Sequence, residues 1–138
     1  MNQKSLRISI VIAVRKDQTT VPALTALKAI SNSSINFEVL LVRGKQPSRQ
    51  RNLAVQSASA DILYFLDDDS VPVEGNLERL VNAFSDPAVA VIGGPNLCPR
   101  DASYLQRVFS EIMGSWLAFG PSYARYRQVG KLRSSSEK

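Results

Sequence analysis

Three adjacent aspartates, Asp67, Asp68 and Asp69, directly follow the apolar run at residues 62–66. Carboxylates this close repel one another, and burial destabilises each of them unless it has a partner. The aspartates therefore need a compensating partner. Three kinds of chemistry place such residues after an apolar strand.

The first kind is a phosphate-binding NTPase, in which the strand-end aspartate holds magnesium beside a glycine-rich loop of pattern GxxxxGK[ST]. The nearest sequence, "RGKQPS" at residues 43–48, has Gln46 where Ser or Thr must follow the lysine. Because the phosphate loop is missing, we reject this interpretation.

The second kind is a haloacid-dehalogenase-like phosphatase, whose Asp-x-Asp-x-Thr/Val motif fits "LDDDSV" at residues 66–71. Asp67 would then be the nucleophile and Asp69 the acid/base. In that family the motif follows the first strand, whereas two strand-helix units precede it here. Little chain remains for the downstream lysine and acidic metal ligands, so this is the weaker alternative.

The third kind is metal-bridged binding of a nucleotide diphosphate. Carboxylate oxygens hold Mg²⁺ or Mn²⁺, and the metal in turn binds the diphosphate oxygens. In such a site the adjacent negative charges are functional. They bind a divalent cation, and the cation in turn binds the anionic ligand.

The composition agrees with an anionic partner. Seventeen Lys and Arg against twelve Asp and Glu give a net charge of +5, which suits a phosphate group, a nucleotide or an acidic membrane surface. The basic residues form two clusters, Arg43, Lys45, Arg49 and Arg51, and then Arg125, Arg127, Lys131, Arg133 and Lys138. Aromatic residues are not interleaved with them, so we expect no nucleic-acid partner.

Cysteine and histidine content excludes several classes of site. The chain has one cysteine, Cys98, and no histidine, which rules out an intramolecular disulfide, a zinc site and a His-based triad. No stretch reaches the roughly 20 apolar residues of a membrane span. We therefore expect a cytoplasmic protein whose only membrane contact is peripheral, at the cytoplasmic face.

Strands and helices alternate up to the aspartates. The β-branched run at 8–14 predicts a strand covered on both faces, and further strands are predicted at 37–42 and 61–66. Helices are predicted at 19–30, with threonine capping and a proline in the first turn, and at 47–60.

Beyond the aspartates, helical spacing of Leu77, Leu80, Val81 and Phe84 predicts another helix, and residues 88–94 predict a fourth strand. An amphipathic helix is predicted at 101–118, followed by a basic tail at 119–138. Its apolar stripe is expected to belong to the core and contains Leu105, Val108, Phe109, Ile112, Met113, Trp116 and Leu117.

This order of elements predicts an α/β fold, with a mostly parallel sheet and helices on both faces, in a single domain over residues 1–138. Such sheets bind ligands at the carboxyl ends of their strands. The aspartates end the third strand and the first basic cluster begins at the end of the second, so both are expected at the same rim.

Three segments in order, "ISIVIAV", "SRQRNLAVQSASADILYFLDDD" and "GNLERLVNAFSDPAVAVIGGP", resemble the donor-binding half of a family 2 glycosyltransferase. The resemblance covers residues 6–97 and implies an incomplete, Rossmann-like GT-A nucleotide-binding fold. It also implies metal-assisted, inverting transfer of a sugar from a nucleotide-diphosphate sugar, commonly a UDP-sugar, to a hydroxyl of a carbohydrate or lipid-linked acceptor. The implied cofactor is Mg²⁺ or Mn²⁺.

The resemblance also implies roles for particular residues. Asp67 and Asp69 correspond to metal ligands. The implied nucleotide-sugar contacts are Ala13, Val14, Arg15, Arg43, Arg51, Asp67 and Asp68. The chain departs from the family at Arg43, where an acidic residue usually recognises the base, so the base of the donor stays open.

The family's general base is a later Asp or Glu that deprotonates the acceptor hydroxyl. Neither Glu111 nor Glu137 is convincing in that role, so the catalytic base is not identified. We expect a truncated chain that is weakly active alone and that could dimerise through exposed apolar surface. A non-catalytic nucleotide-binding or interaction module is the alternative.

Overall fold

The computed structural model describes residues 6–30, 35–99 and 101–128. The chain divides into two units, Met1–Ala90 and Val91–Lys138. The single domain expected over residues 1–138 stays a prediction.

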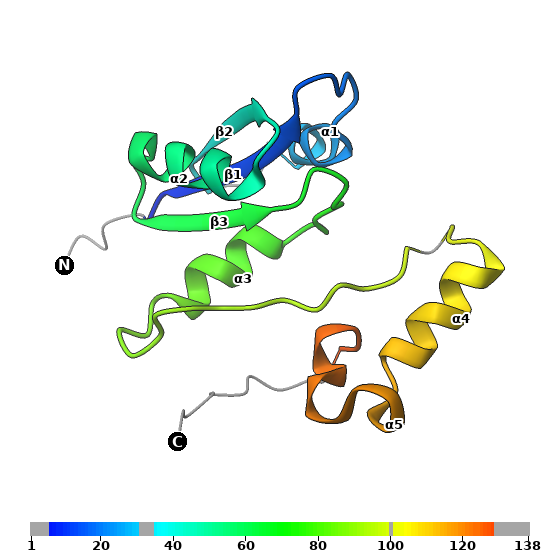
Figure 1. The fold of residues 1–138 in the computed structure, drawn as a ribbon. Helices are drawn as coiled ribbons and strands as arrows, with labels where there is room; N and C mark the ends of the chain where they lie inside the picture. The colour runs from blue at the N-terminus through cyan, green and yellow to red at the C-terminus, as the bar shows by residue number, and fades with distance from the viewer. Residues whose placement is uncertain (1–5, 31–34, 100, 129–138) are drawn as a thin grey trace. The chain divides into compact units, whose positions relative to one another are not determined.

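The first unit is built on a parallel sheet of three strands in the order β2-β1-β3 (Figure 1). These strands are β1 (Ile8–Arg15), β2 (Phe37–Gly44) and β3 (Ile62–Leu66). In the register of the sheet, Ile8 lies beside Phe37 on one side and Ile62 on the other. The α/β class, the three strands before the aspartates and their parallel arrangement are therefore confirmed.

Helices cover both faces of the sheet: α1 (Pro22–Ala29), α2 (Pro47–Ser57) and α3 (Asn76–Ala83). Leu27 of α1 and Leu77 of α3 join the hydrophobic cluster that contains the even-numbered residues of β1. α2 packs against β1 and β2. Because the chain crosses from β1 to β2 and then back past β1 to β3, right-handed crossovers place α1 and α2 on opposite faces.

The start of α1 differs from the prediction. Its N-cap is Val21, and no side chain caps it, so the expected threonine cap is wrong, while Pro22 opens the helix as expected. The backbone N–H of Ala23 instead donates to the carbonyl of Asp68 at 3.1 Å. A free N–H of the first turn is thus satisfied by the segment that carries the aspartates.

The fourth strand predicted at residues 88–94 is wrong, since these residues form no strand in the structure. An apolar run becomes a strand only where a neighbouring strand pairs with it, and this run lies between Pro87 and Pro95. The edge strand β3 also keeps Leu63 and Phe65 40% and 50% exposed. The register of β3 with β1 places both side chains on the face of the sheet where α2 packs against β1 and β2.

The second unit contains α4 (Tyr104–Met113), α5 (Trp116–Phe119) and the 3₁₀ helix η1 (Gly120–Arg125). The single helix predicted at 101–118 is therefore divided after Met113. Ser103 forms a capping box with Gln106 at the start of α4, and Ser115 accepts a hydrogen bond from Leu117 N at the start of α5. The helix divides there because Gly114 is a poor helix former and Ser115 is a good N-cap.

The core position expected for the apolar stripe is wrong for most of its members in this structure. Leu105, Phe109, Trp116 and Leu117 are 65%, 61%, 68% and 91% exposed. Helical periodicity identifies an apolar face but does not supply the surface that covers it.

No helix in residues 6–30, 35–99 or 101–128 is long and apolar enough to cross a membrane.

A polar network joins the sheet to the loop after α2. Ser9 Oγ, which is buried, donates to Glu38 Oε1 at 2.5 Å. The same carboxylate oxygen accepts from Ser59 N at 2.9 Å and from Ser59 Oγ at 3.1 Å. The bond from Ser9 is the largest cause, and the backbone bond from Ser59 the next, of a pKa of Glu38 below its ordinary value of 4.5.

We predict that Glu38→Gln lowers the free energy of unfolding at pH 7. In the variant this free energy should also decrease less as the pH is lowered. A lowered pKa in the folded state means that folding favours the ionised carboxylate. Its stabilisation is complete above about pH 4.5 and is lost as the pH falls below that value through the folded-state pKa. Urea unfolding of both proteins at pH 7 and at a series of lower pH values measures the difference.

Glu74→Gln is the matched control, because Glu74 is exposed. If both variants lose stability in acid to the same extent as the unchanged chain, the network around Glu38 does not contribute to acid sensitivity.

Candidate functional site

A cleft of about 410 Å³ lies at the carboxyl ends of the three strands. The ends of β1 and β2 and the segment after β3 meet there because the strands are parallel and end at the same edge of the sheet. Its lining comes from the end of β1 and the next loop, the end of β2, the first turns of α2, and the segment after β3. The residues are Ala13, Val14, Arg15, Gln18, Gly44, Lys45, Pro47, Gln50, Arg51, Asp67, Asp68 and Asp69.

Most of the predicted site residues meet in this cleft. Those of the nucleotide-sugar set that line it are Ala13, Val14, Arg15, Arg51, Asp67 and Asp68, and Asp69, the second predicted metal ligand, lies beside them. The structure thus brings the aspartates and the basic residues to one rim, while their roles in binding stay predictions.

Arg43 is not among the residues that line this cleft. Its Nη1 donates to the backbone carbonyl of Gln18 at 2.5 Å. The Gln18 N–H in turn donates to the carbonyl of Arg15 at 3.2 Å. Arg43 therefore holds the loop that follows β1 in place. Its direct contact with a nucleotide stays a prediction.

Arg51 compensates part of the charge on the aspartates. Its Nη2 lies 2.9 Å from Asp67 Oδ1, and the two side chains are 40% and 63% exposed. An ion pair this exposed contributes less than about 1 kcal/mol to stability. Its main effect is geometric, because it connects the second turn of α2 to the segment after β3.

Backbone hydrogen bonds hold the aspartate segment in place. Ser70 N donates to the carbonyl of Asp67 at 3.1 Å and closes a turn, while Ala23 N donates to the carbonyl of Asp68. Asp67 and Asp69 are exposed and Asp68 is half-buried. The carboxylates therefore stay hydrated, which limits the cost of keeping three charges together.

The carboxylates do not form a complete metal site by themselves. Among the described residues, no three potential ligands gather closely enough to hold an ion. Magnesium in nucleotide sites, however, uses one or two carboxylates and completes its coordination with water and substrate phosphate. Asp67 and Asp69, which border the same cleft, fit a divalent cation that binds together with a diphosphate.

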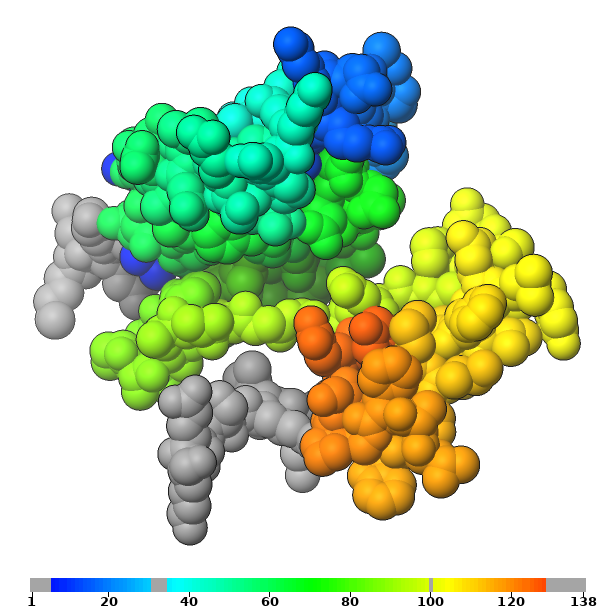
Figure 2. All heavy atoms as spheres, viewed as in Figure 1, coloured from blue at the N-terminus to red at the C-terminus, as the bar shows by residue number. Residues whose placement is uncertain are grey.

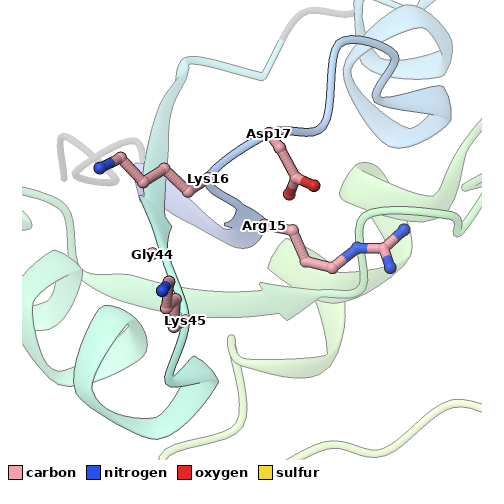
Figure 3. A pocket seen from close by; sticks show the side chains of 5 residues that line it. All are labelled: Arg15, Lys16, Asp17, Gly44 and Lys45. Atoms are coloured by element: carbon pink, nitrogen blue, oxygen red, sulfur yellow. The ribbon is translucent and has the colours of Figure 1, made fainter.

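A second cleft of about 640 Å³ adjoins the first and shares Arg15, Gly44 and Lys45 with it. Lys16 and Asp17 complete its lining. In Figure 3 the side chains of Arg15, the last residue of β1, and of Lys16, the first residue of the next loop, point in different directions. Three cations against one carboxylate favour an anionic group at this end of the sheet.

Two glutamines of the cleft were missed by the sequence analysis. Gln50 is only 5% exposed, and Gln18 has a buried Oε1 without a hydrogen-bond partner in the described residues. The available signal was the position of Gln50, four residues before Ala54 on the face of α2 that turns toward the sheet. A polar residue on the buried face of a helix needs a partner.

The general base remains unassigned. Glu111 is exposed on α4 in the second unit. Glu137 and the basic residues Lys131, Arg133 and Lys138 lie outside the described residues.

Comparisons with known proteins agree with this geometry. Residues 2–132 match the family model described as "Glycosyl transferase family 2". The O-antigen chain rhamnosyltransferase RfbN of Salmonella typhimurium is 35% identical over 98 residues, which cover 70% of this chain and 30% of that protein. The chain thus spans about three-tenths of the length of that relative. No solved structure gives a significant match.

The family match includes all three strands, the cleft at their carboxyl ends and the aspartates. The protein belongs to glycosyl transferase family 2.

Proposed function

We propose that this chain binds a nucleotide-diphosphate sugar and is the donor-binding part of an enzyme that transfers the sugar to an acceptor hydroxyl. The observation that supports this most strongly is the cleft in which Asp67, Asp68 and Asp69 meet Arg15 and Arg51. Family membership favours glycosyl transfer over the phosphatase interpretation of the same aspartates.

In this proposal different residues bind different parts of the donor. Asp67 and Asp69 hold Mg²⁺ or Mn²⁺, and the positive field of Arg15 and Arg51 attracts the diphosphate. The cation, when bound, neutralises the charge that grows on the diphosphate as its bond to the sugar breaks. The end of β1, Ala13 to Arg15, offers the surface for the base.

The sugar and acceptor are proposed from the relative. Its name describes rhamnosyl transfer in an O-antigen chain, so we propose a nucleotide-activated rhamnose or a similar sugar as donor and a glycan as acceptor. The transfer is proposed to invert the anomeric centre, by direct attack of an acceptor hydroxyl that a general base deprotonates. UDP is the first nucleotide to test.

We predict that Asp69→Asn and Asp67→Asn each weaken metal-dependent binding of a nucleoside diphosphate at least about tenfold. The reason is that each change removes a carboxylate from the proposed cation site, and the loss of even an outer-shell partner of a metal site typically lowers metal affinity about 10–100-fold. Calorimetry with UDP, GDP, TDP and CDP, each with Mn²⁺, with Mg²⁺ and with a chelator, measures this. The control is Asp101→Asn, which changes an exposed aspartate of the second unit.

Absence of metal-dependent binding by the unchanged chain would contradict the proposal. Equal affinity of the Asp69 variant and the unchanged chain would remove Asp69 from the metal site.

We also predict that Arg51→Gln lowers donor affinity more than it lowers the stability of the fold. Because the pair with Asp67 is exposed, the free energy of unfolding should fall by less than about 1 kcal/mol. Donor affinity should fall more, since the cleft loses a cation and Asp67 loses the contact that orients it. Urea unfolding and calorimetry measure the two quantities, and a large stability loss with unchanged affinity would be the opposite result.

A single-turnover assay with labelled nucleotide-activated sugars distinguishes an enzyme from a binding module. We expect slow transfer to a glycan acceptor, or slow donor hydrolysis, that depends on the metal and disappears in the Asp69→Asn variant. Tight donor binding with no turnover for any sugar would instead identify the chain as a non-catalytic nucleotide-binding module.

A further inference from the structure

The side chain of Gln50 joins the carboxyl ends of two strands. Its Nε2 donates to the carbonyl of Val14 in β1 at 2.8 Å and to the carbonyl of Val42 in β2 at 2.6 Å. The residue is 5% exposed, so these bonds are shielded from competing water. A primary amide has two N–H donors on one nitrogen, and both are used here.

The amide occupies a space that exists because residue 44 is a glycine. A Cβ atom added to Gly44 would lie 2.9 Å from Gln50 Cδ and 3.1 Å from Gln50 Oε1. The backbone of Gly44 has no positive φ that would require glycine. The requirement is therefore one of space, since the Gln50 side chain can lie this close to the end of β2 only where residue 44 has no side chain.

The next residue along α2 connects the third strand. Arg51 forms its ion pair with Asp67, directly after β3. Two successive residues of α2 thus contact the carboxyl ends of all three strands, where the cleft lies. Gln50 holds the ends of β1 and β2, and Arg51 orients the aspartate segment.

We propose that Gln50 is a positioning residue of the donor site, with Gly44 as the residue that makes room for it. By fixing the spacing of β1 and β2 at their ends, it holds the segment from Ala13 to Arg15 against Gly44 and Lys45. Its effect on donor affinity rests on the proposed function. Its effect on the two strand ends does not, and can be measured without a ligand.

Hydrogen–deuterium exchange of the ligand-free, 138-residue chain tests the first effect. Gln50→Met keeps an unbranched side chain of similar length and removes both donors. Backbone amides at residues 15–18 and 43–46 should exchange about tenfold faster, since both buried hydrogen bonds that hold the strand ends are lost. Amides in the middle of β1, at residues 10–12, should change much less.

Two further variants separate positioning from general destabilisation. Gly44→Ala should produce the same local pattern, because the added methyl group displaces the amide. Ala54→Gly also changes the buried face of α2, where Ala54 is 1% exposed, and weakens the helix without touching the strand ends. Its faster exchange should lie along α2 and leave the two strand ends unchanged.

Calorimetry with the nucleoside diphosphate that binds the unchanged chain best supplies the second readout. Gln50→Met should weaken binding about tenfold, while Ala54→Gly should leave the affinity unchanged at a similar loss of stability. The same exchange pattern in Gln50→Met and Ala54→Gly, or unchanged exchange at the strand ends, would overturn the proposal. If the unchanged chain binds no nucleotide, the proposed function fails, while the exchange pattern still decides whether Gln50 positions the strand ends.

Discussion

Parallel pairing of β1 with both of its neighbours is the constraint on which the first unit depends. It places the carboxyl ends of β1, β2 and β3 at one edge. Burial on both faces of β1 holds this arrangement, with Ile8, Ile10 and Ile12 fully buried on one face and Val11 1% exposed on the other. Each such side chain stabilises the fold by about 1.5–3 kcal/mol. The cleft exists because this strand is central.

The aspartates remain together because their repulsion is offset in two ways. Water solvates the exposed carboxylates, and Arg51 pairs with Asp67 at 2.9 Å. Backbone contacts hold the segment at the same time, since Ala23 at the start of α1 donates to the carbonyl of Asp68. The position of the charges is therefore fixed by the backbone, while the side chains of Asp67 and Asp69 stay exposed in the cleft.

Local pattern predicted the elements well where each of them finds a partner within the first unit. The β-branched run of β1, the apolar spacing of α1 and α3, and the proline and serine at the start of α2 predicted their types and approximate bounds. Two of the failures concern apolar segments, since among the described residues 88–94 pair with no strand and most of the stripe on α4 and α5 stays exposed. Periodicity reports which face is apolar, and only tertiary contact decides whether that face is buried.

The sequence by itself determined the chemical groups of the site and the strand ends that carry them. Asp67 to Asp69 follow an apolar run, and parallel strands must end at one rim, so their meeting with Arg15 and Arg51 was predictable. Tertiary structure alone decided that Arg43 turns to the Gln18 carbonyl and that Gln50 bridges β1 and β2. Hydrogen bonds between side chains and distant backbone depend on distances of tenths of an ångström, which no pattern of residue types contains.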